Sequence, residues 1–395
     1  MTIVASLVGA LLGLVVLVLA VPVLVFTLEI AAACLPARRG VGAAPRPSLA
    51  VLVPAHNEAL GIAATLRTLR SQLRPGDRVL MVADNCSDDT AERARAEGAE
   101  VIERQHATER GKGFALAFGV EHLRQAPPPL VVIVDADCQL EPGALDALAA
   151  ACERSGAPVQ AKYLMTHEGA VGLNGRVAEF AWRVKNWVRP RGAARLGWPC
   201  QLTGSGMAFP WRLIESAPLA NGSIVEDMQL GLVLARAGDA PQFCEAANVR
   251  STFPTSAAAI ASQRTRWEHG HLGMLVDHAW PMLRQGLRRA DWRLLGLALD
   301  LAVPPLALLV MLAGAVWLLA LAMGWAGVGA GPVWAASALL TVLSAAVLAA
   351  WAGWGRAVLA PWDLLRAPWY AVSKLAIYLR FWSRRQKDWV RTDRE

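Results

Sequence analysis

The stretch LVVIVDADCQL, residues 130–140, runs from five apolar residues straight into two acids, Asp135 and Asp137. An apolar run of this length predicts a strand that is buried on both faces of a sheet. Side chains at positions i and i+2 of an extended chain point to the same side, and two carboxylates held that close repel each other. The stretch therefore predicts either a solvated turn or a cation site at the end of a buried strand.

Strands and helices alternate along the chain before this stretch. Strands are predicted in SLAVLVPAHNE (48–58), RVLMVADNCSDDT (78–90) and AEVIER (99–104), and helices over 59–72, over 90–98 and from the turn in ERGKGFALAFGVEHL (109–123). Such alternation predicts an α/β fold with a mostly parallel, doubly wound sheet that helices cover on both faces.

Polar clusters follow three of the predicted strands, at 54–58, 84–85 and 135–137. Ligands of open α/β sheets bind beyond the carboxyl ends of the strands, so these clusters are expected to form one site. Two carboxylates suit a hard divalent cation, Mg²⁺ or Mn²⁺, shared with a diphosphate. The first strand is not followed by GxGxxG, and Lys112 is followed by Gly113 instead of Ser or Thr, which argues against dinucleotide oxidoreductases and P-loop NTPases. The pattern favours a nucleotide-diphosphate substrate.

Apolar blocks predict membrane-spanning helices. Hydrophobic residues make up 55% of the 395 residues, which is high for a soluble protein. Residues 3–26 carry no charge and are long enough to cross a bilayer. Nothing basic precedes this run, and it is too long for the apolar core of a cleaved signal peptide. Two further blocks, 294–325 and 333–354, are also expected to cross the membrane.

Basic residues flank one side of these blocks, which predicts their orientation: Arg38, Arg39, Arg288, Arg289, Arg293 and Arg356. The positive-inside rule places the N-terminus outside and the long middle region in the cytoplasm. We therefore expect a multi-pass protein of a bacterial-type inner membrane. Residues 361–382 are interrupted by charges and are predicted to form an amphipathic helix on the inner face. The expected organisation is a span (1–36), a cytoplasmic domain (37–255), interfacial helices (256–293), two spans (294–356), and an interfacial helix with a basic tail (357–395).

The net charge of +7 is explained by basic residues that contact an anionic leaflet, so the bilayer is an expected partner. Runs of Lys and Arg interleaved with aromatics are missing, and nucleic acid is not an expected partner. The six cysteines are scattered without a CxxC pair, which predicts reduced thiols.

Seven short motifs stand in a characteristic order: VPAHNE (53–58), ADNCSDDT (83–90), GKGFAL (111–116), DAD (135–137), TGSGMAF (203–209), VED (225–227) and QRTRW (263–267). In this order and spacing the chain resembles the membrane-embedded family 2 glycosyltransferases, which include cellulose, chitin, hyaluronan and poly-N-acetylglucosamine synthases. The resemblance covers about residues 48–267. It implies a GT-A-type nucleotide-sugar-binding domain that uses a UDP-sugar and Mg²⁺ or Mn²⁺.

The resemblance implies a donor-binding set: Pro54, Ala55, Glu58, Asp84, Lys112, Asp135, Gln263 and Arg266. Asp84 would hydrogen-bond the uracil edge, and Asp135 and Asp137 would hold the metal, with Asp137 the more direct ligand. Glu58 also suits a helix N-terminus on charge alone. Lys112 would either face the diphosphate or cap local structure.

The resemblance also implies the groups that carry out transfer. Asp227, beside Glu226, would be the catalytic base, because inversion requires a carboxylate that takes the proton of the acceptor hydroxyl. Without the family, the pair is more typical of a helix start. Gln263, Arg266 and Trp267 share one helix face. Arg266 can donate two parallel hydrogen bonds to a phosphate.

An acceptor-binding set is implied as well: Thr203, Gly204, Ser205 and Trp267. Trp267 would stack on the acceptor sugar or lie at the membrane interface. The QRTRW motif favours a growing polysaccharide as acceptor, with an export partner or a second copy completing a channel. Single addition to a membrane lipid, as in ceramide glucosyltransferase-like proteins, and a non-catalytic sensor of nucleotide sugars remain as alternatives.

Overall fold

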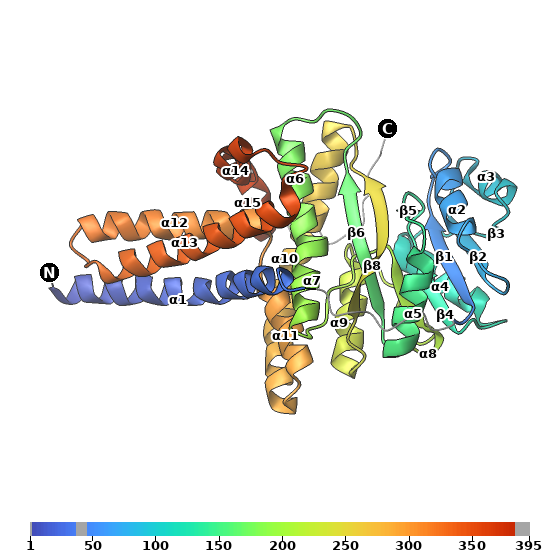
Figure 1. Ribbon diagram of the computed structural model, residues 1–395, viewed down its shortest axis with the longest axis horizontal. Coiled ribbons are helices and arrows are strands. Elements are labelled where there is room, and N and C mark those ends of the chain that lie inside the picture. Colours follow the sequence, from blue (N-terminus) through green and yellow to red (C-terminus); the bar gives the residue numbers. More distant parts are fainter. Residues whose placement is uncertain (1, 37–45, 384–395) are drawn as a thin grey trace. The chain divides into compact units, whose positions relative to one another are not determined.

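A computed structural model describes residues 2–36 and 46–383, which form two compact units. Residues 46–168 and 198–270 make up the sheet unit, and residues 2–36, 169–197 and 271–383 make up the helical unit. Figure 1 labels most of the elements of both units.

The sheet unit contains eight strands in the described residues: β1 (Leu49–Ala55), β2 (Arg78–Asp84), β3 (Glu100–Arg104), β4 (Leu130–Ile133), β5 (Gln139–Leu140), β6 (Val159–Thr166), β7 (Met207–Pro210) and β8 (Gln242–Thr252). Its helices are α2 (Ile62–Arg70), α3 (Thr90–Ala96), α4 (Lys112–Leu123), α5 (Ala144–Ser155), α8 (Trp211–Ile214) and α9 (Glu226–Ala237). The long helix α10 (Ala257–Arg289) begins in the sheet unit and continues into the helical unit.

The strands form one mixed sheet in the order β3-β2-β1-β4-β7-β6-β8-β5. The first four strands in this order are parallel, as the sequence pattern predicts. β7 is antiparallel to both β4 and β6, and β5 is antiparallel to β8, whereas β6 and β8 are parallel. Four of these seven pairings are parallel, so the prediction of a mostly parallel sheet is confirmed. The sequence pattern did not predict the three antiparallel pairings, which involve β7 and β5.

Buried apolar strands and the helices packed on them form the core. Every residue of β1 is buried, which matches its unbroken apolar sequence LAVLVPA. Residues of β1, β2 and β4 pack against α4 and α9 on one face of the sheet. Gly119 of α4 lets the helix approach closely, because a Cβ there would lie only 2.4 Å from Leu52 Cδ1.

The three polar clusters that the sequence predicts follow neighbouring strands, because β2, β1 and β4 are adjacent, parallel and in register. Two asparagines, Asn57 and Asn85, adopt positive φ angles of 53° and 52° directly after β1 and β2. Asn tolerates this left-handed conformation better than most residues. The chain therefore turns sharply where both strands end, and the three clusters lie at the same edge of the sheet.

The helical unit contains α1 (Thr2–Ala33), α6 (Leu173–Arg183), the π-helix η1 (Val184–Val188), α7 (Arg189–Arg195), α11 (Trp292–Ala302), α12 (Leu306–Trp325), α13 (Gly331–Ala350), the π-helix η2 (Trp351–Gly355), α14 (Pro361–Ser373) and α15 (Leu375–Ser383). In the described part of the chain, three helical stretches are long and apolar enough to cross a membrane: Ile3–Ala33, Leu306–Trp325 and Gly331–Gly355.

Two apolar segments differ from the simplest expectation. The block 294–325 is divided into α11 and α12, because Pro304 and Pro305 lack the backbone N–H groups that a continuous helix needs. Residues 361–382 form two short helices, α14 and α15, instead of one. Their tryptophans Trp362, Trp369 and Trp382 are all more than half exposed. The predicted basic tail, 384–395, lies outside the described residues.

A buried ion cluster joins three helices of the helical unit. Arg189 Nε donates to Glu29 Oε2 at 2.6 Å, and Arg189 Nη2 donates to Asp300 Oδ1 at 2.6 Å. All three side chains are buried. Gly192, one turn after Arg189, leaves room for the α1 backbone, because a Cβ there would overlap Glu29 O. Asp300, an acid inside an apolar block, is therefore paired with a basic residue.

Replacing Arg189 with Met is expected to destabilise the helical unit by about 3–5 kcal/mol, because two buried carboxylates lose their counter-charge. Denaturant unfolding of the full chain in detergent measures this loss. The exposed Arg288→Met is the matched control and is expected to change little. Equal stability of the two variants would show that the cluster does not hold α1, α7 and α11 together.

Candidate functional site

Asp84 lies at the end of β2 in a buried polar cluster. Its Oδ1 accepts hydrogen bonds from Arg104 Nη1 at 2.8 Å and from Asn85 Nδ2 at 3.1 Å. Arg104 also donates to Glu109 Oε2 at 2.8 Å. The Asp84 carboxylate is thus held in place by a cation on the neighbouring strand, to which it is paired in register.

The segment after β1 is tied to the segment after β2. Glu58 N donates to Thr90 Oγ1 at 2.8 Å, and His56 Nδ1 lies 2.7 Å from the backbone oxygen of Asp84. Pro54 and Ala55 are buried within β1. These contacts bring Pro54, Ala55 and Glu58 of the predicted donor-binding set beside Asp84.

Lys112 joins two of the predicted clusters. Its ammonium nitrogen lies 2.5 Å from Asp135 Oδ1 and donates to Gly204 O at 2.7 Å. Burial lowers the pKa of Lys112, but the carboxylates of Asp135, Glu226 and Asp227 outweigh burial and raise that pKa overall. Lys112 is therefore a permanent cation among acids.

Glu226 and Asp227 begin α9. Burial and, after it, the Asp227 charge raise the pKa of Glu226 and Lys112 lowers it, which together give a pKa of about 7. Asp227 Oδ1 accepts from the backbone N–H of Met228 at 2.8 Å, which fixes the orientation of this carboxylate. Two adjacent acids thus have different surroundings, and such pairs are typical of acid–base sites.

Arg266 of α10 faces the same acids. Burial lowers its pKa, and the charges of Glu226, Asp135 and Asp227 oppose this change. Gln263 is 3% exposed. Trp267 is half-buried, at the expected spacing on α10. Three acids, Asp135, Glu226 and Asp227, therefore face the two cations Lys112 and Arg266. Asp137 is a fourth acid in the same cluster.

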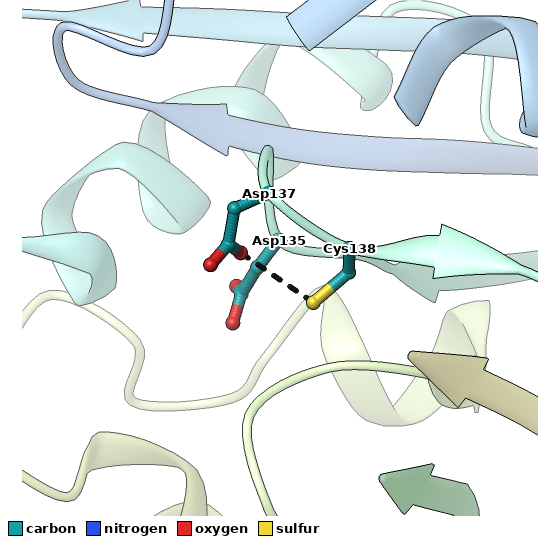
Figure 2. Close-up of side chains that lie close together, drawn as sticks. All are labelled: Asp135, Asp137 and Cys138. Carbon is teal, nitrogen blue, oxygen red and sulfur yellow. Dashed lines mark hydrogen bonds between the residues drawn. The ribbon is translucent and has the colours of Figure 1, made fainter. Parts of the chain in front are cut away.

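Asp137 is held at both carboxylate oxygens. Ser251 Oγ of β8 donates to Oδ2 at 3.1 Å, and the Cys138 thiol donates to Oδ1 at 3.4 Å. One ligand atom each of Asp135, Asp137 and Cys138 lies within 4.8 Å of the others (Figure 2). The excess of negative charge and the carboxylate oxygens fit a hard divalent cation.

The Cys138 thiol does not fit such a cation. Burial, followed by the Asp135 charge, raises the pKa of Cys138 to about 12. A protonated, soft sulfur is a poor ligand for Mg²⁺ or Mn²⁺. Asp135 and Asp137 are therefore the residues suited to hold the metal, and Cys138 supports Asp137.

A family model described as glycosyltransferase like family 2 matches residues 45–270, more than half of the chain. The chain belongs to this family. A mannosyltransferase, PcManGT of Pyrobaculum calidifontis, solved with GDP-mannose and Mn²⁺, is 18% identical with a TM-score of 0.58. That alignment covers 96% of this chain and 99% of the other. It shows a shared GT-A-type fold.

Two further similarities cover less of the chain. Glucosyl-3-phosphoglycerate synthase of Mycobacterium tuberculosis, solved with Mn²⁺, uridine diphosphate and phosphoglyceric acid, is 24% identical with a TM-score of 0.39, over 59% of this chain and 84% of that one. An uncharacterised protein of Methanocaldococcus jannaschii is 36% identical over 92 residues, or 23% of this chain. This match spans 36% of that relative's length.

The loop TGSG of this glycosyltransferase lies against the acids. Gly204 has a φ of +92°, and a Cβ there would lie 3.2 Å from Asp227 Oδ2 and 3.4 Å from Lys112 Nζ. Ser205 Oγ accepts from Asp135 N at 3.1 Å. The buried Gln160 accepts from Thr203 N and donates to Ser205 O, both at 2.9 Å. The loop predicted to bind the acceptor thus forms one wall of the acid cluster.

Sequence reasoning missed several residues that support the predicted ones: Arg104, Cys138, Gln160 and Ser251. Of these, only Arg104 carries a signal in the sequence, as a basic residue at the end of the strand next to Asp84. Cys138 acts on its sequence neighbour Asp137, whereas the roles of Gln160 and Ser251 depend on distant strands meeting in the sheet.

Gly204→Ala is expected to destabilise the sheet unit by about 1–2 kcal/mol, because a side chain is strained at this φ angle. Thermal unfolding of the full chain in detergent tests this. Gly222→Ala is the matched control, because a Cβ there meets open space. If both variants unfold alike, the loop does not need glycine at 204.

Glu226 predicts a pH dependence of stability. Its pKa is about 7 in the folded chain against an ordinary 4.5, so the folded state holds the extra proton between these values. The contribution of Glu226 to stability therefore falls as pH rises through this window. Unfolding of wild type and Glu226→Gln, with a chelator present, at about pH 5 and about pH 8 measures the effect. We expect Glu226→Gln to gain stability relative to wild type at the higher pH, and a constant difference would contradict the raised pKa.

Proposed function

We propose that this family 2 glycosyltransferase catalyses metal-dependent, inverting transfer of a hexose or N-acetylhexosamine from a nucleoside-diphosphate sugar, first of all a UDP-sugar. The observation that carries the proposal is the meeting of Asp135, Lys112 and Asp227 at the end of β4. A metal-binding acid, a cation for the diphosphate and a base are the three groups that the reaction needs.

Each part of the site has a role in the donor complex. Asp84 accepts a hydrogen bond from the base of the nucleotide, beside Pro54, Ala55 and Glu58. Asp135 and Asp137 hold Mg²⁺ or Mn²⁺, which, when bound, offsets the charge of the diphosphate. Lys112 and Arg266 supply the remaining positive charge as the leaving group departs.

Asp227 acts on the acceptor. Its carboxylate takes the hydroxyl proton while the acceptor oxygen attacks the anomeric carbon, and the bond to the diphosphate breaks on the opposite side. Glu226 raises the negative charge around Asp227 and so favours proton uptake. Thr203, Gly204, Ser205 and Trp267 border the space for the acceptor.

The proposed acceptor is a growing polysaccharide at the inner membrane. The QRTRW motif supports this choice, with Gln263 buried and Arg266 facing the acids. A lipid acceptor that receives a single sugar is the second candidate. It is supported by the three helices of spanning length in the described residues, which are few for enclosing a polymer channel. A polysaccharide synthase would then need an export partner or a second copy.

The proposed topology is multi-pass, with the N-terminus outside and the catalytic region in the cytoplasm. The basic residues that flank the apolar blocks support it. In this arrangement the membrane spans lie in residues 1–36 and 294–356, and the catalytic domain is formed by residues 37–255. The segments at the inner membrane interface are residues 256–293 and 357–395. Labelling of a single cysteine placed in 324–332 from outside intact cells tests the orientation.

Two variants test the chemistry. Asp137→Ala is expected to abolish metal-dependent turnover while the chain still folds. Asp227→Asn is expected to lower the rate by on the order of 10²–10⁴ and to keep nucleotide binding, because only the base is lost. The sugar-transfer rate and the Kd for the nucleoside diphosphate are measured for each. Full activity in either variant would contradict the assigned role.

The donor and acceptor are found with membrane vesicles, labelled UDP- and GDP-sugars, and Mg²⁺ or Mn²⁺. Asp227→Asn vesicles provide the background. Label in a large, water-soluble product would support the polysaccharide acceptor, and label only in the organic extract would support the lipid. If no sugar is transferred from any donor, the proposed function is wrong.

A further inference from the structure

The ammonium group of Lys112 occupies a cation position at Asp135. It lies 2.5 Å from Asp135 Oδ1 and is anchored by Gly204 O at 2.7 Å. The two side chains are 18% and 28% exposed, so this ion pair is shielded from solvent more than a surface pair. Lys112 is the first residue of α4, and its flexible stem allows the ammonium to move.

Asp135 cannot serve two cations equally well. A divalent ion on this carboxylate would lie close to an ammonium group that is already 2.5 Å from one oxygen. Two such cations repel strongly where water is scarce. Binding of the metal alone therefore weakens the ion pair between Lys112 and Asp135.

The diphosphate of the donor removes this conflict. It offers oxygens to the metal and, beside it, to the ammonium group, so Lys112 exchanges one anionic partner for another. Glu226 and Asp227 also face Lys112, and they keep the ammonium in the site after it leaves Asp135.

We propose that Lys112 is an internal counter-cation that makes binding of the metal and of the nucleoside diphosphate cooperative. It occupies Asp135 when the site is empty and moves to the diphosphate when metal and nucleotide arrive together. This inference rests on the proposed function, which assigns Asp135 to the metal. Besides stabilising the charge of the leaving diphosphate, Lys112 would then have a second role, because its ammonium group disfavours binding of the metal without the nucleotide.

Mn²⁺ binding measures this coupling without any turnover. The free Mn²⁺ signal in electron paramagnetic resonance gives the Kd for the purified full chain alone and with saturating UDP or GDP. For wild type we expect the nucleotide to tighten Mn²⁺ binding by about tenfold or more. For Lys112→Met we expect Mn²⁺ alone to bind several-fold more tightly and the tightening by nucleotide to fall to about threefold or less.

Three control variants sharpen the test. Lys112→Arg keeps the positive charge and is expected to bind Mn²⁺ alone as weakly as wild type. Lys112→Gln replaces Lys112→Met if the latter does not fold. Asp137→Ala is expected to lose Mn²⁺ binding with and without nucleotide, which ties the signal to this site.

The inference is overturned if Lys112→Met binds Mn²⁺ alone no more tightly than wild type and keeps the full effect of the nucleotide. Cooperative Mn²⁺ and nucleotide binding without sugar transfer would contradict the proposed function and leave the inference standing. Sugar transfer with Mn²⁺ binding that does not depend on Lys112 would support the proposed function and contradict the inference. A wild type that binds no Mn²⁺ under any condition would overturn both.

Discussion

Repulsion between carboxylates at the end of a buried strand is the constraint on which the site depends. Asp135 follows β4, and Glu226 and Asp227 are brought beside it by the start of α9. Lys112 and Arg266 balance only part of this charge. The cost of gathering acids in a shielded place falls when a further cation binds, and a divalent metal would supply that positive charge. The excess of negative charge at this site thus explains why we propose that it binds a divalent metal.

The sheet makes this gathering possible. Parallel pairing of β2, β1 and β4 aligns their carboxyl ends, so the segments proposed to bind the base and the metal lie on one edge. The antiparallel strand β7 then extends the sheet past β4, and β6 and β8 follow it. Because of this change in direction, Gln160 of β6 reaches the TGSG loop, and Ser251 of β8 reaches Asp137. In the proposed function, the parallel half of the sheet carries the donor contacts, and the mixed half supports the acids.

Much of this arrangement was predictable from the sequence. Unbroken apolar runs predict β1, β2 and β4, and Asp135 and Asp137 follow the last of them at a spacing that predicts a shared side. The pairing of β7, β6 and β8 was not predictable, because it depends on contacts between residues far apart in the chain. For the same reason Ser251 and Gln160 show no signal. The pair Arg189–Asp300 also joins distant segments, and the acid alone indicates only that some partner is needed.

The most direct test of the account is a structure of the full chain with Mn²⁺ and a nucleoside diphosphate, with the anomalous signal of manganese used to locate the ion. One strong peak is expected at the carboxylates of Asp135 and Asp137, with the ammonium group of Lys112 on the diphosphate. A peak away from these two acids, or a nucleotide bound far from the end of β4, would contradict it.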